Sequence, residues 1–368
     1  MRFSCERDSL ANAIAVASRA LGLKSYGNGV TLKLKGDTIT IIGQETDMLI
    51  ETRLEVIGNG DGEAVVPTPL TQDMIRSLPG GIIDISSDGT VLTIKSGKVK
   101  VSVYLVANYT TPFKREEDKT SVMVKSELLK AALDQVLRAS AKNESREFVY
   151  TGVLFSSEED GLRLVATDGT RMAVRDIEAA SLLEAGSSEL LLPARSLAEL
   201  ERILQSNAGA PLQVSIGSEE AAFEINGIEL VTRLIKDKYK DYKQLLEASY
   251  PDVLYCDKAE LVEALRRLRR MSRESREITN LKLEISLNMI RLSVNIPQVG
   301  DVVEEIDGAF SNETPISLAF DPESFAEGVD VISSERVMLS MAGHNKPVRI
   351  SNDGDLSLVY IVMPLRQR

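Results

Sequence analysis

The stretch LYCDKAELVEALRRL at residues 254–268 decides the fold, because the chain contains the same pattern three times. The pattern begins with two inward-facing apolar residues separated by one position, which is typical of a β-strand, and continues into an amphipathic helix. In this copy the helix places its apolar residues at the spacing i, i+3, i+4 and i+7, namely Leu261, Ala264, Leu265 and Leu268. The same spacing is found in FSCERDSLANAIAVA at residues 3–17 and in VMVKSELLKAALDQV at residues 122–136.

A second strand and helix follow at matching places in each copy. Apolar strand ends at residues 65–67, 191–193 and 318–320 each lead into a further short helix. Pro67 and Pro193 suit the first turn of such a helix, where a missing N–H group costs little. Paired strands are expected after each helix, and strong turn dipeptides separate several strands: Asp88-Gly89, Asn226-Gly227 and Asp353-Gly354.

We therefore predict an α+β protein of three repeated domains, residues 1–119, 120–246 and 247–368, each with two helices packed on antiparallel sheets. The length of 368 residues agrees with two or three domains. Cys5 and Cys256 occupy equivalent inward strand positions, which favours two buried thiols over a disulfide or a metal site. No apolar run is long enough to span a bilayer and no secretory segment opens the chain, so we expect a cytoplasmic location and no membrane partner.

The net charge of −12 argues at first against a nucleic-acid partner, but the charge is unevenly distributed. Residues 6–24, 125–146 and 258–276, which include the first helix of each copy, carry net charges of +1, +2 and +4. If the copies are arranged around a common axis, these helices form one positive surface inside an acidic shell. The alternative is that the cations only solvate exposed helix faces. The short helix after residue 320 is an exception, because it has no basic residue and carries only acidic ones: Asp321, Glu323, Glu327 and Asp330.

No combination of side chains indicates an enzyme. His344 is the only histidine and lies in an expected turn, so a solvent-exposed residue is the simpler interpretation. Asp168, in the turn sequence ATDG, is better explained as a turn residue than as a nuclease carboxylate. The chain has no Gly-rich phosphate loop, no Cys/His spacing that binds metal and no close carboxylate cluster. We therefore expect no catalytic residue, no cofactor and no metal.

Several motifs resemble the bacterial DNA polymerase III β subunit, the sliding clamp family. The most specific are VATDGTRMAV at residues 165–174 and YIVMPLR at residues 360–366, and the two together are more specific than either alone. NESR at residues 143–146, YTGVLF at 150–155 and LPARS at 192–196 also fit, and the resemblance covers essentially the whole chain. It implies a processivity factor: a head-to-tail homodimeric ring of six domains that encircles duplex DNA.

The resemblance also explains the distribution of charge. A sliding tether should contact phosphates through many weak, non-specific cationic contacts and should read no bases. By analogy with the family, the expected DNA-facing residues are Lys24, Arg76, Arg138, Arg146 and Arg195. The basic helix of the third copy adds Arg266, Arg269 and Arg273.

The resemblance further implies a groove between the middle and C-terminal domains that binds short peptide motifs. The expected partners are the catalytic subunit of DNA polymerase III, the clamp loader and other proteins with clamp-binding motifs. Apolar side chains would form the pocket, methionines would adapt to several partners and arginines would anchor polar groups. The residues implied are Tyr150, Thr167, Gly169, Thr170, Arg171, Met172, Leu245, Ile361, Met363, Pro364, Leu365 and Arg366. Lys240 replaces a proline often found beside this groove, which predicts an altered partner preference.

The subunit contact implied by the family places Val101 and Val103 of the first domain against the helix that carries Arg270 and Met271 in the third. Arg270 stands where an aliphatic residue is expected, so this contact requires an acidic partner. Two other functions remain as alternatives. One is a peptide-binding repeat scaffold that does not enclose DNA, and the other is a nuclease or hydrolase with an unrecognised carboxylate site.

Overall fold

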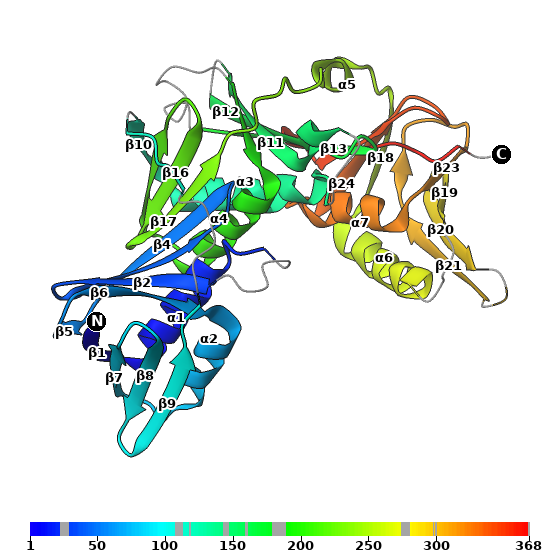
Figure 1. Cartoon of the computed structure of the whole chain (residues 1–368). Helices are drawn as coiled ribbons and strands as arrows, with labels where there is room; N and C mark the ends of the chain where they lie inside the picture. The colour runs from blue at the N-terminus through cyan, green and yellow to red at the C-terminus, as the bar shows by residue number, and fades with distance from the viewer. Residues whose placement is uncertain are drawn as a thin grey trace. The chain divides into compact units, whose positions relative to one another are not determined.

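The structure is a computed structural model that describes most of the chain. The described residues are 1–22, 29–106, 113–117, 119–142, 147–158, 161–178, 189–273, 280–296, 298 and 300–366, and the side chain of Arg273 is not described. They form two compact units (Figure 1). The first unit contains residues 1–130 and 195–234, and the second contains residues 131–194 and 235–368.

The first unit consists of strands and helices that alternate in a repeating order. Its elements are β1 (Arg2–Glu6), α1 (Arg7–Ser18), β2 (Gly29–Lys35), β3 (Thr38–Gln44), β4 (Met48–Glu55), β5 (Ile57–Gly58), β6 (Gly62–Pro67), α2 (Thr68–Ser77), β7 (Ile82–Ser87), β8 (Val91–Ser96), β9 (Val99–Tyr104), β10 (Thr120–Lys125), β15 (Pro211–Ile216), β16 (Glu220–Ile225) and β17 (Ile228–Arg233). Two further helices, α3 (Ser126–Val136) and α4 (Ala194–Ser206), have residues in both units.

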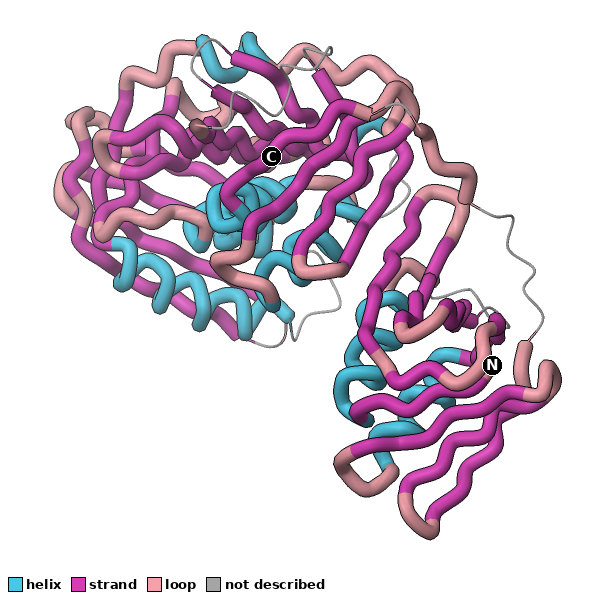
Figure 2. Tube along the Cα trace, turned by 90° about the vertical axis from the view of Figure 1, so that its left-hand side faces the viewer, coloured by secondary structure: helices cyan, strands magenta, loops and turns pink. Residues whose placement is uncertain are grey.

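Helix α1 forms as its sequence predicts. The Glu6 carboxylate accepts a hydrogen bond of 2.6 Å from the backbone N–H of Ser9, which caps the helix start. The apolar stripe from Leu10 to Ala17 is buried, and the helix packs against α2 and against β3 and β4. In Figure 2 the helices nearest the N-terminal label are likewise packed against strands. Burial of this stripe is therefore what holds the helix on the sheets.

Two antiparallel sheets build the first unit. One has the order β5-β1-β7-β8-β9 and the other has the order β10-β15-β16-β17-β4-β3-β2-β6. The second sheet joins the first two predicted domains, because β17 pairs with β4 and places Leu230 opposite Ile50.

The second unit has the same repeating order of elements. They are η1 (Leu137–Ala139), η2 (Phe148–Thr151), β11 (Gly152–Glu158), β12 (Gly161–Thr167), β13 (Arg171–Ile177), β14 (Glu189–Pro193), α5 (Lys243–Glu247), β18 (Asp252–Asp257), α6 (Lys258–Arg273), β19 (Leu281–Ser286), β20 (Met289–Ile296), β21 (Gly300–Asp307), β22 (Ala309–Phe310), β23 (Ile316–Phe320), α7 (Pro322–Asp330), β24 (Arg336–Met341), β25 (Val348–Asn352) and β26 (Asp355–Val362).

Two antiparallel sheets and two neighbouring helices organise the second unit. The sheets have the orders β14-β11-β12-β13-β26-β25-β24-β18-β22 and β21-β20-β19-β23. The larger sheet joins the middle and third predicted domains through the pairing of β13 with β26. Helices α6 and α7 lie side by side (Figure 1), and α7 also contacts β26.

The α+β fold and its repeated strand-and-helix pattern are confirmed. The three expected first helices are α1, α3 and α6, and the three expected second helices are α2, α4 and α7. Asn226 and Gly227 connect β16 to β17 with φ angles of 48° and 74°, the left-handed conformation that a two-residue hairpin turn requires. The placement of the prolines was wrong by one residue. Pro67 is the extended N-cap residue of α2 and Pro193 is the last residue of β14, because both still belong to paired strands.

No described helix is both long enough and apolar enough to cross a membrane. The described residues also contain no group of three or more His, Cys, Asp or Glu side chains that could hold a metal ion. Cys5 and Cys256 are buried free thiols, as the sequence predicts.

Candidate functional site

The ATDG turn between β12 and β13 is built around one carboxylate. Oδ1 of Asp168 accepts hydrogen bonds from the backbone N–H groups of Thr170 at 2.9 Å and Arg171 at 3.1 Å. Gly169 has a φ angle of +90°, and a Cβ atom there would approach the Tyr150 ring at 3.4 Å. Asp168 is therefore a turn residue, and the turn places its glycine directly against Tyr150.

The pairing of β13 with β26 brings the two signature motifs together. Arg171 lies opposite Val362, and Met172 lies opposite Ile361. The backbone N–H of Met363 continues the ladder with a hydrogen bond of 2.9 Å to the Thr170 carbonyl. The ATDG turn and the C-terminal segment are thus neighbours in space, although nearly two hundred residues separate them in the sequence.

Arg171 is held inside the protein and is not free to bind a partner. It is 7% exposed, and its Nε donates to Asp168 Oδ2 at 2.9 Å. Its Nη1 donates to Glu327 of α7 and lies 3.4 Å from the Tyr360 hydroxyl. Burial lowers the pKa of Arg171, but the nearby Tyr360, Glu327 and Asp168 outweigh this effect, so the pKa is raised and the charge is retained. Its role is therefore to hold the turn, β26 and α7 together.

The predicted groove residues divide into an exposed set and a buried set. Met363 is 41% exposed, and Pro364, Leu365 and Tyr150 are partly buried. The remaining surface members are Thr167, Gly169, Thr170, Leu245 and Arg366. Met172 and Ile361 are almost fully buried, so they form the support under this surface.

A buried apolar cluster supports this surface, and sequence reasoning missed part of it. The cluster contains Met172 and Ile361 together with Tyr239 and Tyr242, and Tyr150 and Leu245 pack against it. Burial raises the pKa of Tyr239, in agreement with a neutral phenol in an apolar setting. The two tyrosines belong to the segment YKDY at residues 239–242, which is typical of a polar linker. Their burial could not be recognised from this segment, because the apolar residues they pack against lie elsewhere in the chain.

Lys240 points to solvent and has an acidic partner. Its Nζ lies 3.1 Å from Oε2 of Glu147, and both side chains are about half exposed. The hydrogen bond and charge of Glu147 raise the pKa of Lys240. Because Glu147 lies three residues before Tyr150, this ion pair borders the surface described above.

The predicted DNA-facing cations are exposed to different degrees. Arg76 is exposed in the last turn of α2, and Arg195 is 41% exposed at the start of α4. Arg266 on α6 is 64% exposed, whereas Arg138 is 36% and Arg269 is only 21% exposed. Lys24 and Arg146 lie outside the described residues, and Arg273 is described only as the last residue of α6.

Most of these arginines already contact carboxylates. Arg195 lies 3.1 Å from Glu45, and Arg266 lies 3.0 Å from Glu263. Arg269 and Arg138 contact acidic residues of α7, the helix that stood out in the sequence for its lack of bases. The helix surface is therefore not uniformly positive, because carboxylates of α7 pair with some of its arginines. The net charge of each helix could not show which arginines these carboxylates would contact.

The four residues expected at the subunit contact lie on two different elements. Val101 and Val103 are on β9, where Val103 is buried and Val101 is partly buried. Arg270 and Met271 are near the end of α6, and Arg270 is exposed. Met271 lies next to the start of β21, since a Cβ atom on Gly300 would be 3.3 Å from its methyl group.

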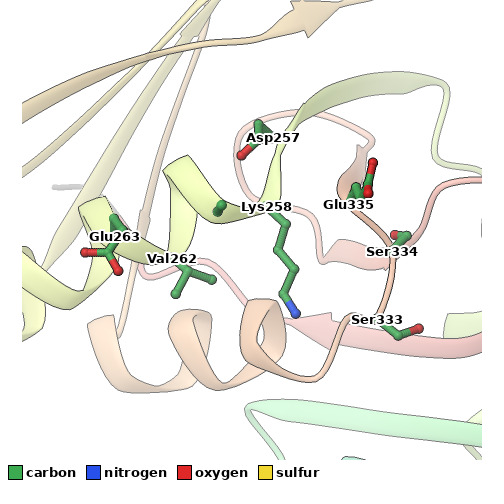
Figure 3. A pocket seen from close by; sticks show the side chains of 8 residues that line it. Asp257, Lys258, Val262, Glu263, Ser333, Ser334 and Glu335 are labelled. Carbon is green, nitrogen blue, oxygen red and sulfur yellow. The ribbon is translucent and has the colours of Figure 1, made fainter.

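A pocket of about 600 Å³ opens beside the first turn of α6 (Figure 3). Its lining comes from the start of α6 and from the loop before β24: Asp257, Lys258, Ala259, Val262, Glu263, Ser333, Ser334 and Glu335. Nζ of Lys258 donates to the Ile332 carbonyl, so the only cation in the lining is bound to the backbone. None of the predicted site residues lines this pocket.

Comparison with known proteins identifies the family. The chain matches the N-terminal domain of the DNA polymerase III beta subunit over residues 1–111, the central domain over 123–241 and the C-terminal domain over 243–366. It is 26% identical to the beta sliding clamp of Streptomyces coelicolor and 24% identical to that of Staphylococcus aureus. Each alignment covers all of this chain and 99% of the relative.

Solved structures show the same fold. The sliding clamp of Bartonella birtlesii matches with a TM-score of 0.91 at 21% identity, and that of Bacillus subtilis matches with 0.89 at 22%; all of both chains is covered in each case. The resemblance drawn from the motifs is thereby confirmed. Because the three domain models follow one another in order along the chain, the chain belongs to the DNA polymerase III beta subunit family of sliding clamps, the non-catalytic processivity factors of that polymerase.

Proposed function

We propose that two copies of this chain form a head-to-tail ring that encircles duplex DNA and binds partner proteins at the surface around Met363. The proposal keeps the three domains at residues 1–119, 120–246 and 247–368. It places the protein in the cytoplasm, where a bacterial chromosome is replicated. The observation that carries the ring is the way in which edge strands of successive repeats pair.

In each predicted domain, the third strand after each of the two helices lies at the border of that domain's part of a sheet. The third strand after the first helix is β4, β13 or β21, and the third strand after the second helix is β17, β26 or β9. In the two pairings that lie within one compact unit, a strand of the first kind pairs antiparallel with a strand of the second kind: β4 with β17, and β13 with β26. The same rule leaves β21 and β9 as complementary edges.

Charge and burial support the pairing of β9 with β21 of a second copy. Among the described residues β9 pairs only with β8, and β21 pairs only with β20. Lys98 directly precedes β9 and Lys100 lies on it, whereas Asp301 and Glu305 lie on β21. The two edges therefore carry opposite charges and attract each other.

A ring explains why individually weak contacts between cations and phosphates are sufficient for DNA binding. The sugar-phosphate backbone would be contacted, without reading of bases, by Arg76, Arg138, Arg195, Arg266 and Arg269 and by the undescribed side chains Lys24, Arg146 and Arg273. Enclosure keeps the protein on DNA, so no single contact has to be strong. A peptide-binding scaffold that does not enclose DNA would give these cations no role, and the family match does not favour it.

The surface around Met363 is proposed to bind the peptide motifs of partners. Met363, Leu365 and Tyr150 offer apolar side chains around the ATDG turn, and the buried pair Met172 and Ile361 supports them. The proposed partners are the catalytic subunit of DNA polymerase III, the clamp loader and other proteins with clamp-binding motifs. Loading requires an external loader, because a closed ring cannot thread onto circular DNA unaided.

The ring is tested by sedimentation and by retention on DNA. We expect a mass of two chains, and a loaded protein that stays on nicked circular DNA but leaves once the circle is cut. Replacing Lys98 and Lys100 with Glu should give single chains, and adding Asp301→Lys with Glu305→Lys should restore the dimer. Lys33→Glu with Lys35→Glu on β2, which are also exposed, is the matched control and should leave the dimer intact. Sedimentation of the unmodified protein as single chains would contradict the ring.

A further inference from the structure

The acidic face of α7 is directed at two arginines of the proposed DNA surface. Two guanidinium nitrogens of Arg269, Nε and Nη2, donate to the Glu323 carboxylate, at 2.9 and 2.5 Å. Asp330 lies 3.5 Å from Arg269 and 3.8 Å from Arg138. Glu323 and Asp330 are seven positions apart, so they lie on one face of the helix.

The contact between Arg269 and Glu323 has the geometry that a phosphate would use. A guanidinium presents two parallel N–H groups, and carboxylates and phosphates accept them in the same fork-like manner. Arg269 is 21% exposed, whereas Arg266, one turn earlier on the same helix, is 64% exposed and forms an ion pair with Glu263 of its own helix. Glu323 therefore occupies the position at which Arg269 would otherwise receive a phosphate oxygen.

Helix α7 is fixed firmly enough to hold these carboxylates in place. Phe325, Ala326 and Val329 on its other face are buried in the core. Gly328 packs so closely on Tyr360 that a Cβ atom would lie 2.5 Å from the ring. Asp321 caps the helix start by accepting a 2.7 Å hydrogen bond from the Ser324 backbone. The acidic face is thus a rigid feature and not the end of a mobile loop.

We propose that Glu323 and Asp330 act as built-in competitors of DNA phosphate, which weaken the contacts of Arg269 and Arg138 with DNA. The proposal rests on the proposed DNA surface and adds a role for residues that the surface itself does not include. A phosphate that approaches Arg269 must displace a carboxylate, so the net gain of each contact is smaller than for an unpaired arginine. A ring that holds DNA by enclosure gains from this arrangement, because weak contacts break easily as it slides.

The test is the salt dependence of DNA binding by the full-length dimer. Glu323→Gln with Asp330→Asn removes both charges and keeps the side-chain shapes. Arg269 loses both of its acidic partners on α7 and should add roughly one phosphate contact, whereas Arg138 keeps its 3.5 Å contact with Asp134 and should add less. The slope of log K against log salt should therefore become steeper by about 1. Affinity for a fluorescent duplex of about 20 base pairs should rise about three- to tenfold near 50 mM salt. Fluorescence anisotropy across about 50 to 200 mM salt measures both quantities.

A matched control separates this competition from a general change of charge. Asp176→Asn with Asp353→Asn also removes two carboxylates that pair with arginines of the same unit, Arg163 and Arg336, which are not part of the proposed DNA surface. This control should leave the slope unchanged. Adding Arg269→Gln to the α7 variant should remove at least half of the increase. If the double variant of α7 does not fold, Glu323→Gln alone should give a smaller increase in the same direction.

The results distinguish failure of this inference from failure of the proposed DNA surface. Arg266→Glu should weaken DNA binding, because Arg266 is the most exposed of the described arginines in the proposed surface of this unit. If Arg266→Glu weakens binding but the α7 variant has the slope of the unmodified protein or of the control, competition by α7 is refuted. If Arg266→Glu has no effect, the DNA surface itself has been misplaced.

Discussion

The buried ion pair between Arg171 and Glu327 gives the sharpest prediction for stability. Glu327→Gln keeps the shape of the side chain and removes its charge, while Arg171 retains its 2.9 Å contact with Asp168. Breaking a fully buried pair costs about 3–5 kcal/mol, and losing one charged hydrogen bond costs about 1.5–3 kcal/mol. Because one carboxylate remains, we expect the free energy of unfolding to fall by about 2 kcal/mol.

This loss should be visible by thermal and urea denaturation. For a unit of this size a loss of 2 kcal/mol corresponds to a decrease in Tm of roughly 4–8 °C. Peptide affinity should fall as well, because Arg171 holds the ATDG turn against β26. The double-mutant cycle with Arg171→Met should give a coupling energy of about 1–3 kcal/mol.

A surface pair on the same unit serves as the control. Glu263→Gln removes the partner of Arg266 from a pair in which both side chains are at least half exposed. Such pairs contribute about 0–1 kcal/mol, so stability should change little. If the free energy of unfolding of Glu327→Gln also lies within about 0.5 kcal/mol of that of the unmodified protein, the ion pair does not hold the turn, β26 and α7 together.

Three further predictions concern other parts of the molecule. Met363→Ala with Leu365→Ala should abolish binding of a clamp-motif peptide in calorimetry and leave the dimer intact, and an unchanged Kd would show that the peptide site is misplaced. Glu116 accepts backbone hydrogen bonds that lower its pKa from 4.5 to about 2, so its contribution to stability is present above pH 4.5 and is lost as the pH falls towards 2. The difference in Tm between the unmodified protein and Glu116→Gln should therefore shrink over that range, and a constant difference would contradict it. Burial raises the pKa of the Cys5 and Cys256 thiols to about 12, so a thiol reagent at neutral pH should label them only after denaturation, and rapid labelling of the folded protein would contradict their burial.

The local part of the fold could be predicted because its causes are local. The stripe from Leu10 to Ala17 and its counterparts repeat at helical spacing, and a buried helix face needs nothing more than that spacing to be recognised. The turn at Asn226-Gly227 was equally predictable, since few residues tolerate two successive positive φ angles. Asp168 was correctly assigned to a turn for another local reason, because an aspartate side chain can accept hydrogen bonds from the backbone two and three residues further on.

The tertiary structure decided which distant residues meet. The pairing of β13 with β26 depends on the register of two edge strands, and no local pattern specifies a register between segments so far apart. Glu327 could not be assigned to Arg171, nor Glu323 to Arg269, because a carboxylate on a short helix can face many cations until the helix is packed. Sequence alone therefore determined that the chain is a threefold repeat and that its third first helix, α6, is strongly basic, whereas α1 and α3 carry no net positive charge within their own bounds. Only packing decided that acidic α7 neutralises part of that charge, because ion pairs form between surfaces and surfaces exist only after folding.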